Sequence, residues 1–243
     1  MELDAVYVLS VKSFTERHQH IRQQLAAYDI PFEFIFDFDP DQLQEDGSPQ
    51  TLSRAHKSLI LKHRCAWERA CANALEKVLI FEDDVILKRN FASRLHAVLE
   101  SVTTLEPGWL VFLGGADSKL SDRFFLDPSL LIPHPISTAE AYITDNVACC
   151  ARLDWLSKNT SDLPADHLLR HIDSAVGIQQ YWPRDALLVQ GSINGRFSST
   201  LDGSRRKHSD FVNWMRFQWQ RFQRRKLRKW FIQAVNLSSR ARF

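Results

Sequence analysis

Three adjacent carboxylates, Glu82, Asp83 and Asp84, directly follow the apolar run 78–81. The run is typical of a buried strand, and ligands of open α/β sheets bind beyond the carboxyl ends of such strands. Alternation along an extended chain would send Glu82 and Asp84 to one side and Asp83 to the other. We therefore expect Glu82 and Asp84 to hold one hard divalent cation, Mn²⁺ or Mg²⁺.

A cation at this position would keep coordination sites open for phosphate oxygens and would stabilise negative charge on a departing diphosphate. The alternative is structural: the acids cap the next segment or pair with Lys88 and Arg89 at the surface. The chain contains neither a GxGxxG nor a GxxxxGK[ST] motif, so dinucleotide and P-loop sites are not favoured. With only eight glycines, we expect metal and basic side chains to bind the phosphates.

The elements that position these acids follow an α/β order. The segment 5–11 is apolar and β-rich, 13–28 has helical spacing, and 31–38 alternates with a period of two. This opening predicts a parallel β-α-β unit. Further segments alternate in the same way: helices at 52–74, 90–102, 146–159 and from 164, and strands at 77–82, 109–113, 140–144 and 181–192. We expect Ser10 and Val11, at the end of the first strand, and Arg17, on the next helix, to form part of a nucleotide pocket.

Two histidines, His56 and His63, lie seven residues apart on one face of the predicted helix 52–74. That spacing is too long for both to bind one metal ion. A lone helical histidine is more often a structural group than a catalyst, and the pattern does not decide between these roles.

Composition supports a folded chain. The 243 residues are 44% hydrophobic and 25% charged, which excludes wholesale disorder, collagen and coiled coil. There is no apolar run of about 18 residues, and Glu2 and Asp4 stand where a secretory signal would be basic. We expect the mature chain to start at Met1 in the cytoplasm. The four cysteines form no CxxC pair, so we expect reduced thiols that pack as small core residues.

Charge divides the chain into two predicted parts. Residues 205–243 hold twelve Lys and Arg against Asp210 alone, a net of +11, whereas residues 1–204 hold 19 basic and 28 acidic residues, a net of −9. We expect a catalytic domain over 1–204 and a basic amphipathic helical tail over 205–243. Aromatic and basic side chains at helical spacing suit an anionic bilayer surface. Packing of the aromatics on the body and binding of RNA are the alternatives.

Several motifs together resemble the family 25 glycosyltransferases of lipopolysaccharide biosynthesis. They are LKHRCAW (61–67), VLIFEDDVIL (78–87), AYIT (141–144), LPAD (163–166) and LLVQGS…FSS (187–199), in family order over roughly residues 5–200. The resemblance implies a nucleotide-diphosphosugar transferase (GT-A-like) fold, with a central, mostly parallel sheet flanked by helices. It also implies that the acidic motif holds Mn²⁺ against the donor diphosphate.

The same resemblance implies roles for individual residues. Glu82, Asp83 and Asp84 stand at the acidic motif, with Asp83 a donor-binding residue. His63 and Trp67 stand at the Ser-His-x-x-x-Trp element, and Tyr142 matches its Ala-Tyr aromatic. Lys62 replaces the usual Ser, so it contacts donor phosphate directly or the chain differs in its donor. The remaining matches are Asp166 at Pro-x-Asp, and Gln190 and Ser198 near the end of the domain, with Gln190 a donor-binding residue.

The expected function is an inverting, metal-dependent hexosyl transfer. The resemblance implies galactose from UDP-galactose as the hexose and a lipid-linked lipopolysaccharide or lipooligosaccharide as the acceptor. Asp166 is the nominated catalytic base, with His63 as a further catalytic candidate; alternatively Asp166 is a first-turn acid favoured by the helix dipole. The tail would place the enzyme at the inner face of the cytoplasmic membrane. The competing functions are a metal-dependent phosphate hydrolase and, less favoured, a nucleic-acid-binding module that acts through the tail.

Overall fold

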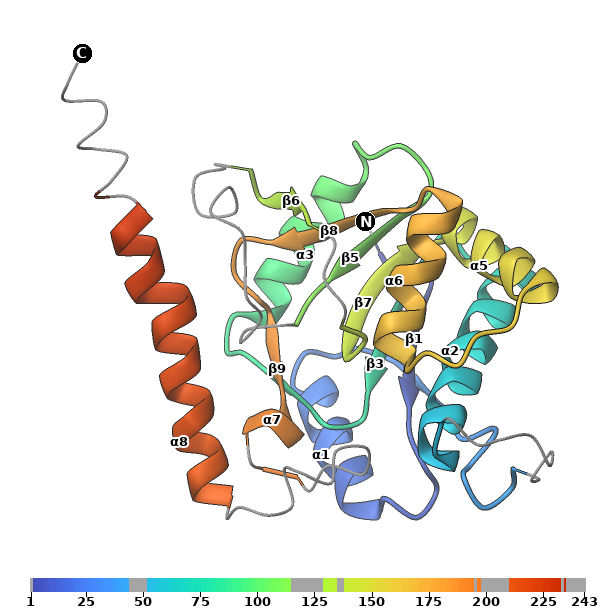
Figure 1. Ribbon diagram of the computed structural model, residues 1–243, viewed down its shortest axis with the longest axis horizontal. Coiled ribbons are helices and arrows are strands. Elements are labelled where there is room, and N and C mark those ends of the chain that lie inside the picture. Colours follow the sequence, from blue (N-terminus) through green and yellow to red (C-terminus); the bar gives the residue numbers. More distant parts are fainter. Residues whose placement is uncertain are drawn as a thin grey trace.

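The computed structural model describes residues 2–43, 52–114, 129–134, 138–194, 196–197, 210–232 and 234. Its centre is a seven-stranded sheet in the order β2-β1-β3-β7-β5-β8-β6 (Figure 1). The strands are β1 (Ala5–Leu9), β2 (Glu33–Ile35), β3 (Lys77–Glu82), β5 (Trp109–Phe112), β6 (Leu131–Pro133), β7 (Ala141–Asp145) and β8 (Gln179–Pro183). The helices are α1 (Thr15–Ala26), α2 (Arg54–Ala72), α3 (Phe91–Val102), α5 (Asn146–Lys158), α6 (Ala165–Val176), α7 (Gly191–Asn194) and α8 (Asp210–Arg221).

The sheet is mostly parallel in strand direction. β1 pairs in parallel with β2 and β3, and β5 pairs in parallel with β8. β7 runs antiparallel to both β3 and β5, and β6 runs antiparallel to β8. Five of the seven strands in this sheet of the described chain therefore point the same way. The predicted α/β fold with a central, mostly parallel sheet and flanking helices is confirmed.

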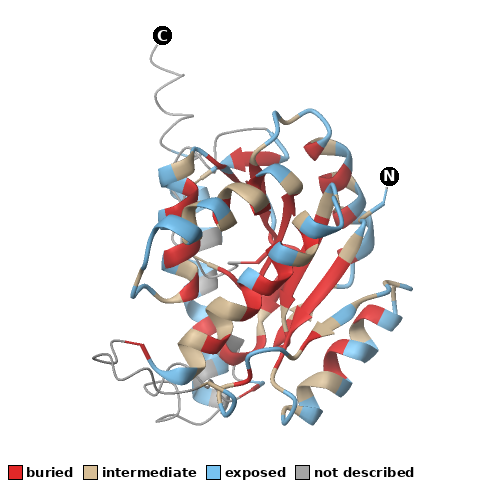
Figure 2. Cartoon of the chain, turned by 90° about the vertical axis from the view of Figure 1, so that its right-hand side faces the viewer, coloured by how far each residue is buried: buried red, intermediate tan, exposed pale blue. Residues whose placement is uncertain are grey.

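Alternating side chains of the strands build two apolar layers, one on each face of the sheet. Val8, Phe81 and Val111 pack with α1 and α3 on one face. On the opposite face, Leu9 and Ile80 pack with residues of α2, α5 and α6 and form the second core. The central strands are buried along most of their length (Figure 2). This sandwich leaves the ends of the strands as the places where polar side chains can gather.

A small ribbon next to the main sheet was not predicted. β4 (Val85–Leu87) and β9 (Leu188–Gln190) form an antiparallel pair. The single strand expected over 181–192 is thus wrong: it divides into β8 and β9, with Arg184–Leu187 between them. β4 begins immediately after the acidic triplet, so the triplet lies in the turn between β3 and β4.

The expectation of four reduced cysteines is also wrong. Cys71 on α2 and Cys150 on α5 form a disulfide, with their Cα atoms 5.8 Å apart, while Cys65 and Cys149 are free and buried. The two bonded cysteines are 79 residues apart in sequence. Their pairing depends on how α2 and α5 pack together, which no local spacing reveals.

The described residues 210–232 of the basic tail are helical, as expected. α8 is followed by the π-helical segment η2 (Phe222–Leu227), and helical structure continues to residue 232. Figure 1 shows α8 at the edge of the molecule, outside the main sheet. The predicted domain boundary after residue 204 and the matched Ser198 lie outside the described residues. Within the described ranges, the search for a helix with the length and apolarity of a membrane span finds none.

Candidate active site

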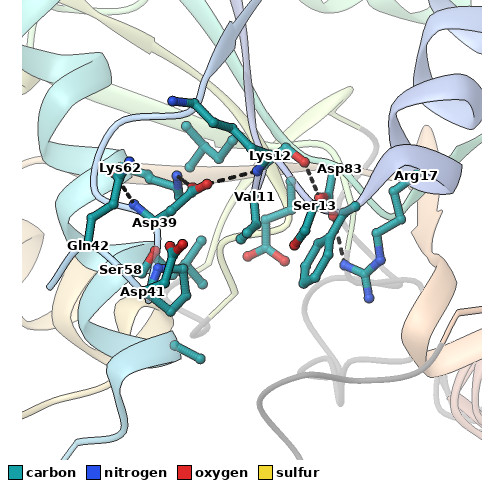
Figure 3. Close-up of a pocket in the computed structure, with 17 residues that line it drawn as sticks. Val11, Lys12, Ser13, Arg17, Asp39, Asp41, Gln42, Ser58, Lys62 and Asp83 are labelled. Carbon is teal, nitrogen blue, oxygen red and sulfur yellow. Dashed lines mark hydrogen bonds and ion pairs between the residues drawn. The ribbon is translucent and has the colours of Figure 1, made fainter.

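A cavity of about 510 Å³ lies at the carboxyl ends of β1, β2 and β3 (Figure 3). Its walls come from the end of β1, the start of α1, the loop after β2, one side of α2 and the end of β3. The predicted site residues on these walls are Ser10, Val11, Arg17, Lys62, Glu82 and Asp83. The cavity lies where the parallel order of these strands predicted a ligand site.

Asp83 is held on the cavity wall by two donors. The Ser10 hydroxyl donates to its Oδ2 at 2.5 Å, and Arg17 Nη1 donates to its Oδ1 at 2.8 Å (Figure 3). Arg17 and Asp83 are both largely buried, with side-chain exposures of 14% and 6%. Charge-assisted hydrogen bonds have a defined geometry. These two bonds therefore fix the Arg17 guanidinium and the Asp83 carboxylate side by side at the carboxyl ends of β1 and β3.

Lys62 lines the cavity and is held by three hydrogen bonds to the end of β2 and the loop after it. Its Nζ donates to Asp39 Oδ1 at 2.7 Å, to the Asp37 carbonyl at 2.7 Å and to the Ile35 carbonyl at 3.5 Å. Asp39 in turn accepts from the Lys12 backbone N–H at 2.9 Å. Lys62 thus ties the loop after β2 to the end of β1, and its contact with donor phosphate stays a prediction.

Glu82 lies among other carboxyl groups. The pKa of Glu82 is raised well above its usual range, first by burial and then by the negative charges of Asp84, Glu140, Asp83 and Asp166. Its Oε2 accepts from Gln190 Nε2 at 3.2 Å, so the predicted donor-binding residue Gln190 reaches the cluster from β9. Five carboxyl groups from three stretches of the chain, 82–84, Glu140 and Asp166, thus lie within electrostatic reach of one another.

Asp84 lies behind the cavity wall, against α7. Its Oδ2 accepts from the Ser192 backbone N–H at 3.0 Å, and its carbonyl accepts from the Gly191 N–H at 2.7 Å. A Cβ at Gly191 would lie 2.4 Å from the Asp84 carbonyl oxygen, so only glycine fits there. Burial, followed by the charge of Asp83, raises the pKa of Asp84.

The alternation that placed Glu82 and Asp84 on a common side requires an extended chain. The strand ends at Glu82, and Asp83 and Asp84 belong to the turn before β4. Consequently Glu82 and Asp83 line the cavity, while Asp84 does not. Glu82 and Asp84 still interact, because the charge of Asp84 raises the pKa of Glu82 more than any other charged neighbour does.

The residues present fit a divalent cation in part. Asp84 Oδ1 is buried and has no hydrogen-bond partner, and the surrounding carboxyl groups raise one another's pKa. Within the described ranges, no group of three His, Cys, Asp or Glu side chains has an arrangement that would hold a metal ion. A divalent cation held by one or two of these carboxylates, with substrate phosphates and water completing its shell, stays a prediction.

Glu140 belongs to the acidic cluster, although the sequence reasoning did not single it out. Its backbone carbonyl accepts from the Glu82 N–H at 2.9 Å, and its buried side chain packs over Gly114, where a Cβ would lie 2.1 Å from Oε1. β7 is antiparallel, so its beginning lies beside the end of β3. Glu140 is the first residue of the predicted strand 140–144. Only the antiparallel pairing of β7 with β3 brings it to the acidic cluster, and the sequence does not indicate that pairing.

Asp166 lies in the first turn of α6, as predicted, and its charge reaches Glu82. Its Oδ1 accepts from the adjacent His167 N–H at 2.9 Å, while Pro164 is the N-cap residue. Asp166 is only partly buried. The structure therefore brings the nominated base within electrostatic reach of the acidic cluster, although Asp166 does not line the cavity at the ends of β1 to β3.

His63 lies in the apolar core between α2 and β7. It is 3% exposed, its Nδ1 lies 2.9 Å from the Tyr142 hydroxyl, and it lines none of the described cavities. Burial, reinforced by the charge of Arg152, lowers the pKa of His63 to about 3. Trp67 Nε1 donates to the same hydroxyl at 3.0 Å. The geometry supports a structural role for His63. The side chain has no contact with the cavity, which a catalytic role would require.

The fold and the cavity define an α/β protein with a ligand site at the carboxyl edge of its sheet. Residues 3–113, which contain β1 to β5 and the acidic turn, match glycosyltransferase family 25, described as an LPS biosynthesis protein. This part of the chain is therefore similar to that family.

The relatives differ in what their names say of activity. A rat protein named "Probable inactive glycosyltransferase 25 family member 3" is 26% identical over 208 residues, 76% of this chain and 36% of that protein. The Haemophilus influenzae "Lipooligosaccharide biosynthesis protein lic2B" is 32% identical over 92 residues, 35% of each chain. The chain thus spans about a third of the length of these relatives. A crystal structure of a glycosyltransferase involved in glycosylation of the PBCV-1 major capsid aligns over 84% of this chain and 99% of its own, with a TM-score of 0.45 and 10% identity.

Proposed function

We propose that this protein is a glycosyltransferase that moves a hexose from a nucleotide diphosphosugar onto a lipopolysaccharide or lipooligosaccharide acceptor. The observation that carries the proposal is the cavity at the ends of β1 to β3, where Arg17 and Asp83 are fixed beside an excess of carboxyl groups. The similarity of residues 3–113 to glycosyltransferase family 25 and the lipooligosaccharide relative support the same class of reaction. We further propose UDP-galactose as the donor and inversion as the stereochemical outcome.

The donor would bind with its nucleoside in the cavity between the Ser10–Val11 end of β1 and the loop held by Lys62 and Asp39. Arg17 offers positive charge at the diphosphate end. Glu82 and Asp84 would hold Mn²⁺ or Mg²⁺, which when bound would neutralise the diphosphate and favour its departure. Asp83, oriented by Ser10 and Arg17, and Gln190, bonded to Glu82, keep this edge in a fixed geometry.

In the proposed reaction, an acceptor hydroxyl oxygen attacks the anomeric carbon as the bond from that carbon to the diphosphate oxygen breaks. Attack from the opposite face inverts the configuration. Asp166 takes the hydroxyl proton, and the nucleoside diphosphate leaves with the electron pair of the broken bond. Asp166 suits this task because it is partly exposed and lies within electrostatic reach of Glu82.

A donor screen tests the proposal. The full chain is incubated with a truncated lipooligosaccharide and each of several nucleotide sugars, with Mn²⁺ or with EDTA, and nucleoside diphosphate release is measured. We expect acceptor-dependent release of UDP from UDP-galactose that EDTA abolishes. Phosphate release without acceptor would instead indicate a hydrolase, and absence of turnover with every donor would indicate an inactive chain, as the rat relative is named.

The role of Asp166 has its own comparison within the same assay. The Asp166→Asn variant should lose about 10²- to 10⁴-fold in turnover, the usual contribution of a positioned base. Asp162→Asn is the matched control, because Asp162 is an exposed acid in the segment before α6. Equal turnover of the two variants would remove Asp166 from the mechanism and leave the proposed reaction class standing.

A further inference from the structure

The tail helix contacts the body through one side. Phe217, at the middle of α8, is 3% exposed and packs with Ala186, Val189 and Ile86 of the β4–β9 region. Met215 and Trp219 lie two residues before and after Phe217 and therefore face away from it on a helix. They are 52% and 59% exposed. The helix is thus anchored on one side and presents large apolar groups on the other.

The exposed apolar groups form a continuous stripe. Val212, Met215, Trp219 and Phe222 follow one another at spacings of three, four and three residues, which places them on one helical face. The Trp219 and Phe222 rings are stacked, with centroids 6.0 Å apart. Exposed apolar side chains continue beyond the π-helical segment with Trp230 and Phe231, which are 66% and 71% exposed.

This concentration differs from the rest of the described surface. Of the twelve large hydrophobic side chains that are exposed in the described part of the chain, eight lie between residues 212 and 231. The other four, Phe38, Leu130, Val147 and Leu163, are scattered over the body. Scattered exposed hydrophobics are ordinary, whereas a contiguous group marks an interaction surface.

Charge indicates what covers this surface. Exposed basic side chains accompany the stripe, among them Arg216, Lys226 and Lys229, and Asp210 is the only acid in residues 205–243. A helix with Trp, Phe and aliphatic groups on one face and Lys and Arg around it suits the boundary between headgroups and acyl chains of an anionic bilayer. Each basic residue near such a surface adds to the attraction. Single-stranded nucleic acid would use the aromatic rings for stacking but gives the aliphatic Val212 and Met215 no equivalent partner.

We propose that the outward stripe of α8 and η2, with its basic flanks, docks this protein on an anionic lipid surface. The apolar side chains enter the headgroup boundary while Phe217 keeps the helix attached to the body. Phe217 attaches the helix to the β4–β9 ribbon, and β4 directly follows the acidic turn of the candidate active site. The docking helix is therefore joined to the strand next to that site. Docking does not depend on the proposed transferase reaction.

Co-sedimentation with vesicles tests the proposal on the full chain. The probes are phosphatidylcholine vesicles and vesicles that also contain phosphatidylglycerol, each at low and high salt. We expect the chain to pellet with the anionic vesicles, at least about tenfold more than with the neutral ones at low salt, and less at high salt because salt screens the basic residues. A chain that stays in the supernatant with both vesicle types overturns the proposal.

A pair of matched double variants separates the stripe from general hydrophobicity. Trp219→Ser with Phe222→Ser should reduce pelleting about tenfold or more. Leu130→Ser with Val147→Ser removes exposed apolar groups from the body and should leave pelleting unchanged. Thermal unfolding of each variant shows that the body is folded. Equal pelleting of the two variants, or binding of single-stranded RNA that vesicles do not compete away, contradicts a lipid surface as the partner.

Discussion

Two clusters of buried polar groups lie on the same sheet, and they differ in charge balance. At the carboxyl edge, the four acids Glu82, Asp83, Asp84 and Glu140 gather, and Arg17 forms an ion pair with Asp83. Behind the sheet, Arg152 Nε and Nη2 donate to Asp173 at 2.7 and 3.0 Å, and its Nη1 donates to Thr144 at 3.0 Å. Glu82 and Asp83 of the first cluster line the cavity at the ends of β1 to β3. In the second cluster, the Arg152 and Asp173 side chains are 0% and 1% exposed.

We interpret this difference in charge balance as one between a cluster that binds a ligand and a cluster that holds the fold. In the inner cluster each charge has a partner, and the Arg152 guanidinium also lies 5.3 Å from the Trp67 ring centre. The Trp67–Tyr142–His63 hydrogen bonds adjoin it. In the edge cluster, carboxyl groups raise each other's pKa and Asp84 Oδ1 has no partner. A site for a cation-bound ligand is expected to be under-neutralised without that ligand.

The largest expected effect tests the inner cluster. Arg152→Met should destabilise the protein by about 3–5 kcal/mol, because it leaves the Asp173 carboxylate buried without its partner. Arg152 and Asp173 are 0% and 1% exposed, which is why this loss is not offset by water. Urea unfolding followed by circular dichroism measures the change.

A control for that prediction lies on the same helix. Lys158 and Asp154 form an ion pair in which both side chains are 66% exposed, so Lys158→Met should cost at most about 1 kcal/mol. If the two variants unfold at the same urea concentration, the inner cluster does not hold the fold as described.

A smaller effect, confined to acidic pH, tests His63. Its pKa is about 3 in the folded chain and about 6.5 when unfolded. Between these values the unfolded chain binds the proton and the folded chain does not, so His63 makes stability fall as the pH drops from 6.5 towards 3. His63→Gln keeps an acceptor for Tyr142 and should unfold with a shallower pH dependence over this range.

His96→Gln is the matched control, because His96 is a helical histidine with a side chain that is 62% exposed. It should keep the pH dependence of the unmodified chain. A His63→Gln variant with that same dependence would mean that His63 is accessible to protons in the folded state, which would reopen a catalytic role for it.

Much of the fold could be predicted because its signals are local. The period-two and helical patterns gave β1, α1, β3 and α2, and the apolar run that stops at Glu82 gave the position of the cavity. The division of 181–192 into β8 and β9 could not be predicted, because β9 pairs with β4, about a hundred residues earlier. The Cys71–Cys150 disulfide depends in the same way on packing between distant helices.

The position of the site at the carboxyl ends of the strands could be predicted from the sequence. The arrangement of the side chains within the site was harder to predict. Ser10, Val11, Arg17 and Asp83 line the cavity as expected. The strict alternation applied to the acidic triplet failed because the strand ends at Glu82. The role of Lys62 was missed since its partner Asp39 lies in a loop that has no repeating pattern. Glu140 reaches the cluster only through the antiparallel pairing of β7, which the sequence leaves open.

The central claim is that the acidic edge binds a nucleoside diphosphate through a divalent cation. Calorimetric titration of UDP into the full chain, with Mn²⁺ and with EDTA, tests it most directly. The chain should bind UDP at least about tenfold more tightly with Mn²⁺. Asp84→Asn should lose this difference without unfolding, since the amide keeps an oxygen for the Ser192 N–H, whereas Asp154→Asn on the exposed face of α5 should retain it. Equal UDP affinity with Mn²⁺ and with EDTA, or no UDP binding under either condition, would contradict the account.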